Sequence, residues 1–210
     1  MVSVHTALAH QPEYVNSQAA IHIPDPDTSR AYYGELTGAP AVYTISSTQE
    51  FSLYLGILAP YLPDARKDFS VTVTNATGTT IATLSAPTSQ WQAWYEEFAG
   101  DTYWKGPEFK QNVPAGIYTI SVSNPGNIGK YVLAPGEAEV FTLAGTPSTI
   151  RQLYLVKTLF FEKSWYSVFQ GIIGRVLLGV IVFFTTSLCL IAFFLYMKIQ
   201  KRKRKYHIQP

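Results

Sequence analysis

The chain has 210 residues, 47% of them hydrophobic, and a formal net charge of +2 at pH 7. This small net charge hides a division, because residues 1–150 hold six basic residues against thirteen acidic ones, whereas residues 151–210 hold ten against one. A nucleic-acid-binding protein carries its positive charge on a folded surface, so this distribution argues against a nucleic-acid partner. The single cysteine, Cys189, excludes an intrachain disulfide.

The N-terminus resembles the end of an export signal. Residues 1–9 finish in Ala7-Leu8-Ala9, a small-residue pattern typical of a signal-peptidase site, but little hydrophobic sequence precedes it. We interpret residues 1–9 as a truncated signal-peptide remnant and residues 10–19 as an N-terminal extension. The alternative is an ordinary disordered N-terminus.

Residues 20–143 show the alternation of apolar and polar residues that is typical of half-buried strands. The predicted strands are 21–23, 32–36, 43–45, 51–57, 69–73, 81–84, 118–122, 130–133 and 139–143. Turn residues separate them, and no long helical pattern intervenes. We therefore predict an all-β domain, an antiparallel β-sandwich of eight or nine strands with a jelly-roll or immunoglobulin-like arrangement.

The stretch 86–113 interrupts this alternation, and we predict a long loop that carries the function. Aromatic faces stack on sugar rings, and nearby carboxylates accept hydrogen bonds from sugar hydroxyls. The loop therefore predicts a site for a glycan or a partner protein. The predicted ligand-binding residues are Trp91, Trp94, Tyr95, Tyr103 and Trp104. In the alternative interpretation these aromatic residues close one end of the sandwich.

The same stretch holds acidic residues that could supply hard oxygen ligands to calcium. They are Glu96, Glu97, Asp101 and Glu108. Their spacing matches no EF-hand loop, and the alternative is that they are solvated. No other cofactor is predicted. The sequence contains no nucleophile elbow, no phosphate-binding glycine-rich loop and no cluster of His or Cys at metal-binding spacing, so we predict that the protein is not an enzyme.

A membrane anchor follows the sandwich. Residues 144–170 are predicted to be a linker and interfacial stalk, in which Trp165 and Tyr166 suit the aromatic belt of a membrane surface. Residues 171–197 are predicted to form a transmembrane helix, because Val176 to Met197 is a run of 22 uncharged residues. Residues 198–210 form a basic tail.

The basic tail predicts the orientation of the chain, because lysine and arginine next to a span stay in the cytoplasm. We expect a type I single-pass protein of the cell membrane, with the sandwich outside the cytoplasm and the lipid bilayer as one partner. A tail-anchored protein with a cytoplasmic sandwich is the rival topology.

The late strands carry a family resemblance. The segment from Pro114 to Val122, read as Pro-Ala-Gly-Ile-Tyr-Thr-Ile-Ser-Val, and the segment 130–133 resemble the bacterial pre-peptidase C-terminal domain. Residues 31–36 and 104–109 look like uncharacterised prokaryotic membrane-anchored proteins. The order of sandwich, stalk, span and basic tail is similar to that of the p24 cargo receptors, but this chain lacks their paired cysteines and dilysine signal.

These observations predict a surface module that recognises a glycan or a partner protein without catalysis. The alternative is a structural or accessory subunit of a membrane complex, in which the sandwich packs on a neighbouring protein.

Overall fold

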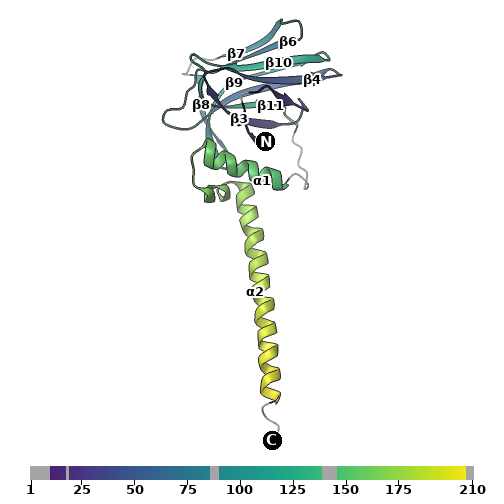
Figure 1. Cartoon of the computed structure of the whole chain (residues 1–210), viewed down its shortest axis with the longest axis vertical. Coiled ribbons are helices and arrows are strands. Elements are labelled where there is room, and N and C mark those ends of the chain that lie inside the picture. The colour runs from purple at the N-terminus through teal and green to yellow at the C-terminus, as the bar shows by residue number, and fades with distance from the viewer. Residues whose placement is uncertain (1–9, 18, 86–89, 139–145, 207–210) are drawn as a thin grey trace, which may run out of the picture.

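The structure is a computed structural model of the chain, and it describes residues 10–17, 19–85, 90–138 and 146–206, with side chains described as far as residue 201. It is a β-sandwich above a layer of short helices, from which one long helix, α2 (Ile172–Tyr206), projects (Figure 1). The interpreted signal-peptide remnant, 1–9, and the strand predicted at 139–143 lie outside the described residues.

Eleven strands form two sheets in the described part of the chain, which confirms the predicted β-sandwich. The strands are β1 (Gln11–Tyr14), β2 (Ile21–Ile23), β3 (Arg30–Thr37), β4 (Ala41–Ser47), β5 (Phe51–Pro60), β6 (Ser70–Asn75), β7 (Thr80–Ser85), β8 (Gln92–Glu96), β9 (Asp101–Val113), β10 (Gly116–Ser123) and β11 (Ile128–Pro135). One sheet has the order β1-β3-β11-β5-β9-β8 and the other β2-β4-β10-β6-β7. Most neighbours are antiparallel, but β1 pairs with β3, and β2 with β4, in parallel, so both sheets are mixed.

The main core lies between the two sheets and is built from alternating apolar positions. Leu53, Leu55 and Ile57 of β5 are at most 1% exposed, as the period of a strand predicts. Two tyrosines meet inside this core, where Tyr43 Oη lies 2.8 Å from Tyr131 Oη. Each buried hydroxyl thus has a hydrogen-bond partner, and burial raises the pKa of Tyr131 to about 12.

The prediction of a loop over residues 86–113 is wrong for residues 92–113, because strands β8 and β9 form a hairpin over that range. Strand β9 is covered on both faces over its first part: Tyr103 is buried under the short helices, and Trp104 packs against the core between the sheets. A strand that is covered on both faces has no polar side, so its sequence lacks the alternation by which a half-buried strand is recognised.

The segment predicted as linker and stalk contains three short helices: α1 (Thr146–Leu155), the π-helical turn η3 (Val156–Phe160) and the 3-10 helix η4 (Trp165–Phe169). Val156, Phe160 and Phe161 are at most 4% exposed. They pack on the outer face of the six-stranded sheet, against Tyr33 and Tyr103. The inner face of the six-stranded sheet is therefore covered by the five-stranded sheet, and its outer face is partly covered by α1, η3 and η4. We name these three helices together the helical layer.

A buried charge cluster joins the helical layer to the β8–β9 hairpin. Asp101 is 1% exposed. Its Oδ2 lies 2.6 Å from Lys157 Nζ, and its Oδ1 lies 2.7 Å from Lys163 Nζ. Lys157 also donates to the Ala99 carbonyl at 2.5 Å. Burial lowers the pKa of Lys157, and the carboxylate of Asp101 opposes that shift. A charge at this depth is tolerated because it is paired.

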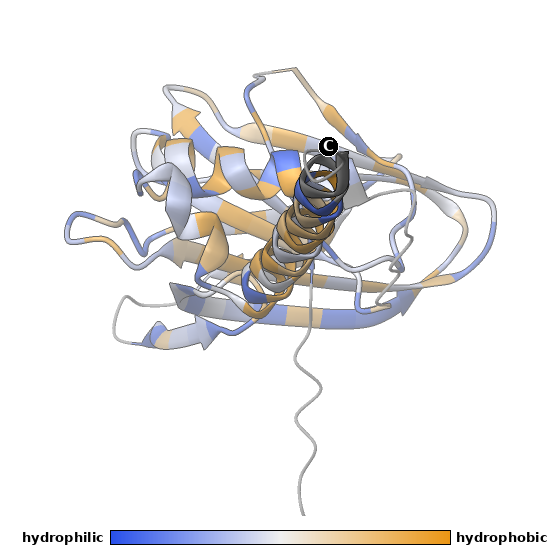
Figure 2. Ribbon diagram, turned by 90° about the horizontal axis from the view of Figure 1, so that it is seen from below, coloured by the Kyte–Doolittle hydropathy of each residue, from blue (hydrophilic) through white to orange (hydrophobic). Residues whose placement is uncertain are grey.

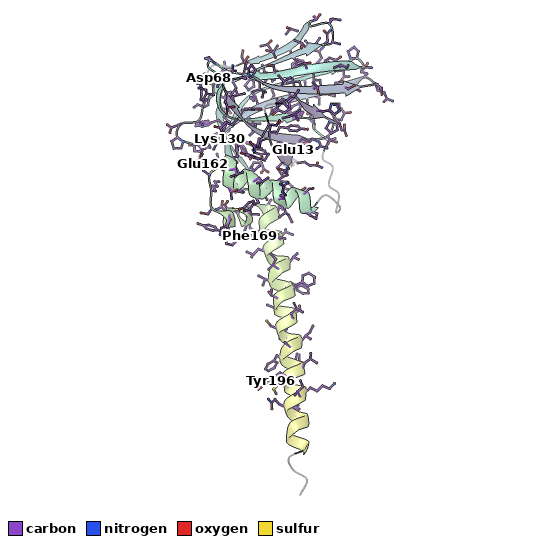
Figure 3. All side chains as sticks on the ribbon, in the orientation of Figure 1. Glu13, Asp68, Lys130, Glu162, Phe169 and Tyr196 are labelled. Carbon is purple, nitrogen blue, oxygen red and sulfur yellow. The ribbon has the colours of Figure 1, made fainter. Side chains whose placement is uncertain are left out.

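Two further polar contacts hold the helical layer to the sheet. Lys130 of β11 forms an ion pair with Glu162 at 2.6 Å and donates to the Phe160 carbonyl at 2.9 Å. Lys130 and Glu162 lie together between the sheet and the helices (Figure 3). On β1, the edge strand of the sheet, the Tyr14 N–H donates to Gln152 Oε1 of α1 at 2.9 Å.

The turn between β8 and β9 caps the N-terminus of α2. The Ile172 N–H donates to the Glu97 carbonyl at 3.1 Å, and the Ile173 N–H donates to the Phe98 carbonyl at 3.3 Å. Two of the N–H groups that the start of a helix leaves unpaired are thereby satisfied. Gly171 permits this approach, because a Cβ there would lie 2.0 Å from the Phe98 oxygen. The long helix is therefore seated directly on the sandwich domain.

Most of α2 is apolar and faces away from the rest of the chain. The segment Ile172–Lys201 is long and apolar enough to cross a membrane, and its most apolar window is not buried by the protein. Figure 2 shows the hydrophobic residues along this helix, which projects from the domain. The segment is compatible with a single-pass membrane anchor and includes the predicted run 176–197.

We expect Phe160→Ala to lower the free energy of unfolding by about 3–5 kcal/mol, because it leaves a cavity between η3 and the sheet. The matched control is Leu159→Ala, since the neighbouring Leu159 is 50% exposed and its loss should change stability by about 0.5 kcal/mol or less. Chemical denaturation of the full chain in detergent measures both values. Equal losses would contradict the packing of η3 on the sheet.

We expect Asp101→Leu to destabilise the protein by about 3–5 kcal/mol, because it leaves Lys157 buried without a countercharge. The double variant Asp101→Leu/Lys157→Met should regain most of this loss, and Glu97→Gln, at an exposed acid in the adjacent turn, should have little effect. Thermal unfolding compares the four proteins. A double variant that is as unstable as the single one would argue against a paired charge cluster.

Candidate functional site

A shallow recess opens on the outer face of the six-stranded sheet, beside the helical layer. Its empty volume is about 350 Å³, including space open to solvent. Leu58, Trp94 and Ala134 line the recess and also belong to the apolar cluster beneath the helices, which places the recess on that face. The remaining lining residues come from β5, β9 and the segment before β1. They are His10, Tyr54, Gly56, Ile57, Lys105 and Glu108.

Small residues make the floor of the recess. Gly56 lies on β5, where a Cβ would come within 3.8 Å of the Ala134 side chain on β11 and within 3.5 Å of Tyr54 Oη. A larger residue at position 56 would therefore extend into the space above the floor. The strand period gives Gly56 this outward position, because Leu55 and Ile57 on either side face the core.

Aromatic rings form the walls. Trp94 is partly buried and packs against Tyr103 beneath the helical layer, with 6.0 Å between the ring centroids. Tyr54 stands on β5 and is also partly buried. Lys105 Nζ lies 6.0 Å from the centroid of the Trp94 ring. Since only part of the indole is covered by protein, the rest is available to a ligand.

Glu108 is the centre of the polar contacts in the recess. Its Oε1 accepts a hydrogen bond from Tyr54 Oη at 2.7 Å and forms an ion pair with Lys105 Nζ at 2.8 Å. Burial acts to raise the pKa of Glu108, but the hydrogen bonds from Lys105 and Tyr54 outweigh it and hold this pKa below its usual 4.5. His10 adds an imidazole whose Nδ1 lies 2.5 Å from Ser29 Oγ. The recess thus combines an acid, an amine, a phenol and an imidazole beside an indole.

The structure does not bring the five predicted aromatic residues together. Trp94 lines the recess, whereas Tyr95, its neighbour on β8, is 51% exposed elsewhere. Trp91 is 4% exposed in the core between the sheets, and Tyr103 is 2% exposed under the helices, so neither offers a face to a ligand. Their burial explains the aromatic density of this stretch as packing.

Trp104 contributes to a separate aromatic surface. Its ring lies 4.7 Å from the Tyr61 ring between centroids, and Lys67 Nζ lies 3.9 Å from its centroid. A cation over an indole face is a favourable contact that already occupies this ring. Trp104 also packs against the core between the sheets and is not one of the residues that line the recess.

The four acidic residues predicted as calcium ligands have separate roles. Glu96 accepts hydrogen bonds from the Phe98 and Ala99 N–H groups, both at 2.7 Å. Asp101 pairs with the buried Lys157 and the partly exposed Lys163, and Glu108 belongs to the recess. Glu97 is exposed. Among the residues that the structure describes, no three acidic, histidine or cysteine side chains are placed to hold a metal ion together.

Sequence reasoning missed Tyr54, Gly56 and His10. Tyr54 and Gly56 alternate with the core residues of β5, and that alternation predicts that they face away from the core. A glycine at an outward position of a strand often marks a place where a ligand or another backbone comes close to the sheet. No pattern in the sequence indicates that His10 lies beside them.

Comparisons with known protein families and with curated proteins give no match. Among solved structures, the pre-peptidase C-terminal domain of a collagenase from Bacillus anthracis is similar to this chain, with 15% identity and a TM-score of 0.38, over 58% of this chain and 97% of that one. It is the kind of domain that the late strands of the sequence resemble.

Two other solved structures also have low similarity to this chain. The module CBM35 from Cellvibrio japonicus shares 18% identity with a TM-score of 0.29, over 48% of this chain and 68% of that one. The catalytic domain of a GH87 alpha-1,3-glucanase in complex with nigerose shares 13% identity with a TM-score of 0.29, and the match covers 50% of this chain and 22% of that one. Similarities at this level do not indicate what this chain binds.

Proposed function

We propose that the chain is a single-pass membrane protein whose β-sandwich binds a glycan in the recess without catalysis. The observation that supports this most is the recess itself, in which a partly exposed indole, Trp94, stands beside the hydrogen-bonding groups of Glu108 and Lys105. A ligand site of this kind combines an apolar surface with a few placed polar groups.

The chemistry of a sugar ring fits these groups. The C–H face of a pyranose is apolar and packs on an indole, while its hydroxyls both donate and accept hydrogen bonds. Glu108 accepts hydrogen bonds, Lys105 donates them, and the Tyr54 hydroxyl does both. Gly56 and Ala134, which have no side-chain atoms beyond Cβ, keep the floor of the recess low beside Trp94 and Tyr54.

Binding without catalysis follows from the acids present. Hydrolysis of a glycosidic bond generally uses two carboxylates about 5 to 9.5 Å apart, one on each side of the bond. Of the described residues that line the recess, Glu108 is the one acid. The nearby acids Glu96 and Asp101 are engaged with backbone N–H groups and lysines on the other side of Trp94. We therefore infer recognition and not turnover.

We infer the topology from charge. Lys198 and the basic cluster 201–205 adjoin the C-terminal end of the apolar segment, and basic residues at that position remain on the cytoplasmic side. The sandwich then lies on the extracytoplasmic side, where glycans are displayed. Trp165 and Tyr166, which are 64% and 59% exposed beside the start of α2, would lie at the level of the lipid headgroups.

We expect Trp94→Ala to reduce glycan binding by about tenfold or more, because the indole provides the stacking face. The matched control is Tyr95→Ala, which removes an exposed aromatic ring at the next position of the same strand. A glycan array probed with the detergent-solubilised chain measures binding, and thermal unfolding confirms that each variant is folded. Loss of binding in both variants, or an array without any hit, would count against the recess.

We expect glycan binding to be retained at mildly acidic pH and lost only as the pH falls below 4.5. The pKa of Glu108 in the folded protein lies below this usual value. Above pH 4.5 the carboxylate is therefore charged and contributes to stability, and both the charge and this contribution are lost as the pH falls through the lowered pKa. Glu108→Gln removes the charge at every pH. The pH profiles of the two proteins should therefore differ near neutrality and converge in acid. Parallel profiles would exclude Glu108 from the site.

A further inference from the structure

The recess faces the side of the domain from which the membrane helix leaves. In Figure 1 the five-stranded sheet, the six-stranded sheet, the helical layer and α2 follow one another from top to bottom. The recess lies on the outer face of the six-stranded sheet, the same face that the helical layer covers. Its mouth therefore lies on the side of the domain nearer to α2.

The distance from the recess to the membrane segment is short. Trp94 precedes Glu97 by three residues, and a strand rises about 3.3 Å per residue, so the two are separated by about 10 Å or less. The Glu97 carbonyl accepts a hydrogen bond from the Ile172 N–H, at the first residue of the apolar helix, over 3.1 Å. A wall of the recess thus lies within about 13 Å of the start of the membrane segment.

This distance is fixed by the structure. The carbonyls of Glu97 and Phe98 hold the start of α2, and Gly171 allows the backbones to touch. Gly174 packs in the same way on η4, since a Cβ there would lie 2.0 Å from the Val168 oxygen. Within the described residues, the turn that follows the strand of Trp94 contacts the start of the helix directly, so the domain has little freedom to lift the recess away from the bilayer.

Exposed aromatic residues mark the level of the membrane surface. Trp165 and Tyr166 of η4 are 64% and 59% exposed, and η4 contacts the first turns of α2. Such residues gather at the headgroup region of a bilayer. The helical layer alone separates this level from the sheet that carries the recess, and one helix is about 10 Å across. A sugar attached directly to a lipid of the same leaflet would therefore reach the recess.

We propose that the glycan recognised in the recess is the saccharide headgroup of a glycolipid in the same membrane leaflet as α2. This inference rests on the proposed function and adds the source of the sugar. A distant polysaccharide would be met more readily by the five-stranded sheet, which faces away from α2 (Figure 1). The position of the recess favours a ligand that approaches along the membrane surface.

The test uses the full chain reconstituted in phosphatidylcholine vesicles with a hexosyl diacylglycerol that carries a photoreactive diazirine on its sugar. Illumination should cross-link the sugar to the β8–β9 hairpin, as mapped by peptide mass spectrometry. Trp94→Ala should lower the yield by about tenfold, whereas Tyr95→Ala should leave it unchanged. The free methyl hexoside with the same diazirine, added in water, is tested in parallel.

The outcomes separate the two proposals. Labelling by the lipid-borne sugar that depends on Trp94 supports both of them. Labelling by the free hexoside alone, or by the glycolipid only when it is placed in separate vesicles, would leave the proposed function standing and overturn the same-leaflet source. Labelling by neither, together with an empty glycan array, would overturn both.

Discussion

The arrangement of this protein depends on the pairing of one buried acid. Asp101 belongs to the β8–β9 hairpin, and its two lysine partners, Lys157 and Lys163, belong to the segment after the sandwich. An unpaired charge at this depth costs several kcal/mol, so the hairpin and the helical layer are strongly disfavoured from separating. The Phe161 ring packs on Tyr103 of the hairpin and the Phe160 ring packs on Tyr33 of β3, so aromatic contacts also hold the helical layer to the sheet.

The β8–β9 hairpin has three roles, of which this pairing is one. Its outer face contributes Trp94, Lys105 and Glu108 to the recess, its buried end contributes Asp101, and its turn caps α2. Because one short element does all three, the recess and the start of α2 hold a fixed relation to each other.

The candidate site was predictable only in part, because several of the residues that suggested it are buried in the folded chain. Aromatic density drew attention to the segment around Trp94, but it could not separate a partly exposed indole from Trp91, which packs in the core beside Phe69. Likewise, the acidic residues of this segment indicated a ligand site. In the structure Asp101 balances lysines that lie more than fifty residues later in the chain, and no local spacing reveals such a partner.

The sequence by itself determined the β-sandwich, through strand alternation and turn residues, and the apolar helix, through an unbroken run of hydrophobic residues. Both patterns are local, and their periods follow from the geometry of strands and helices. Only the tertiary structure decided that the segment from Thr146 to Phe169 covers part of the sheet, that the first part of strand β9 is covered on both faces, and that Tyr54, Gly56 and His10 line the same recess as Trp94. These features arise from contacts between distant parts of the chain, which leave no period in the sequence.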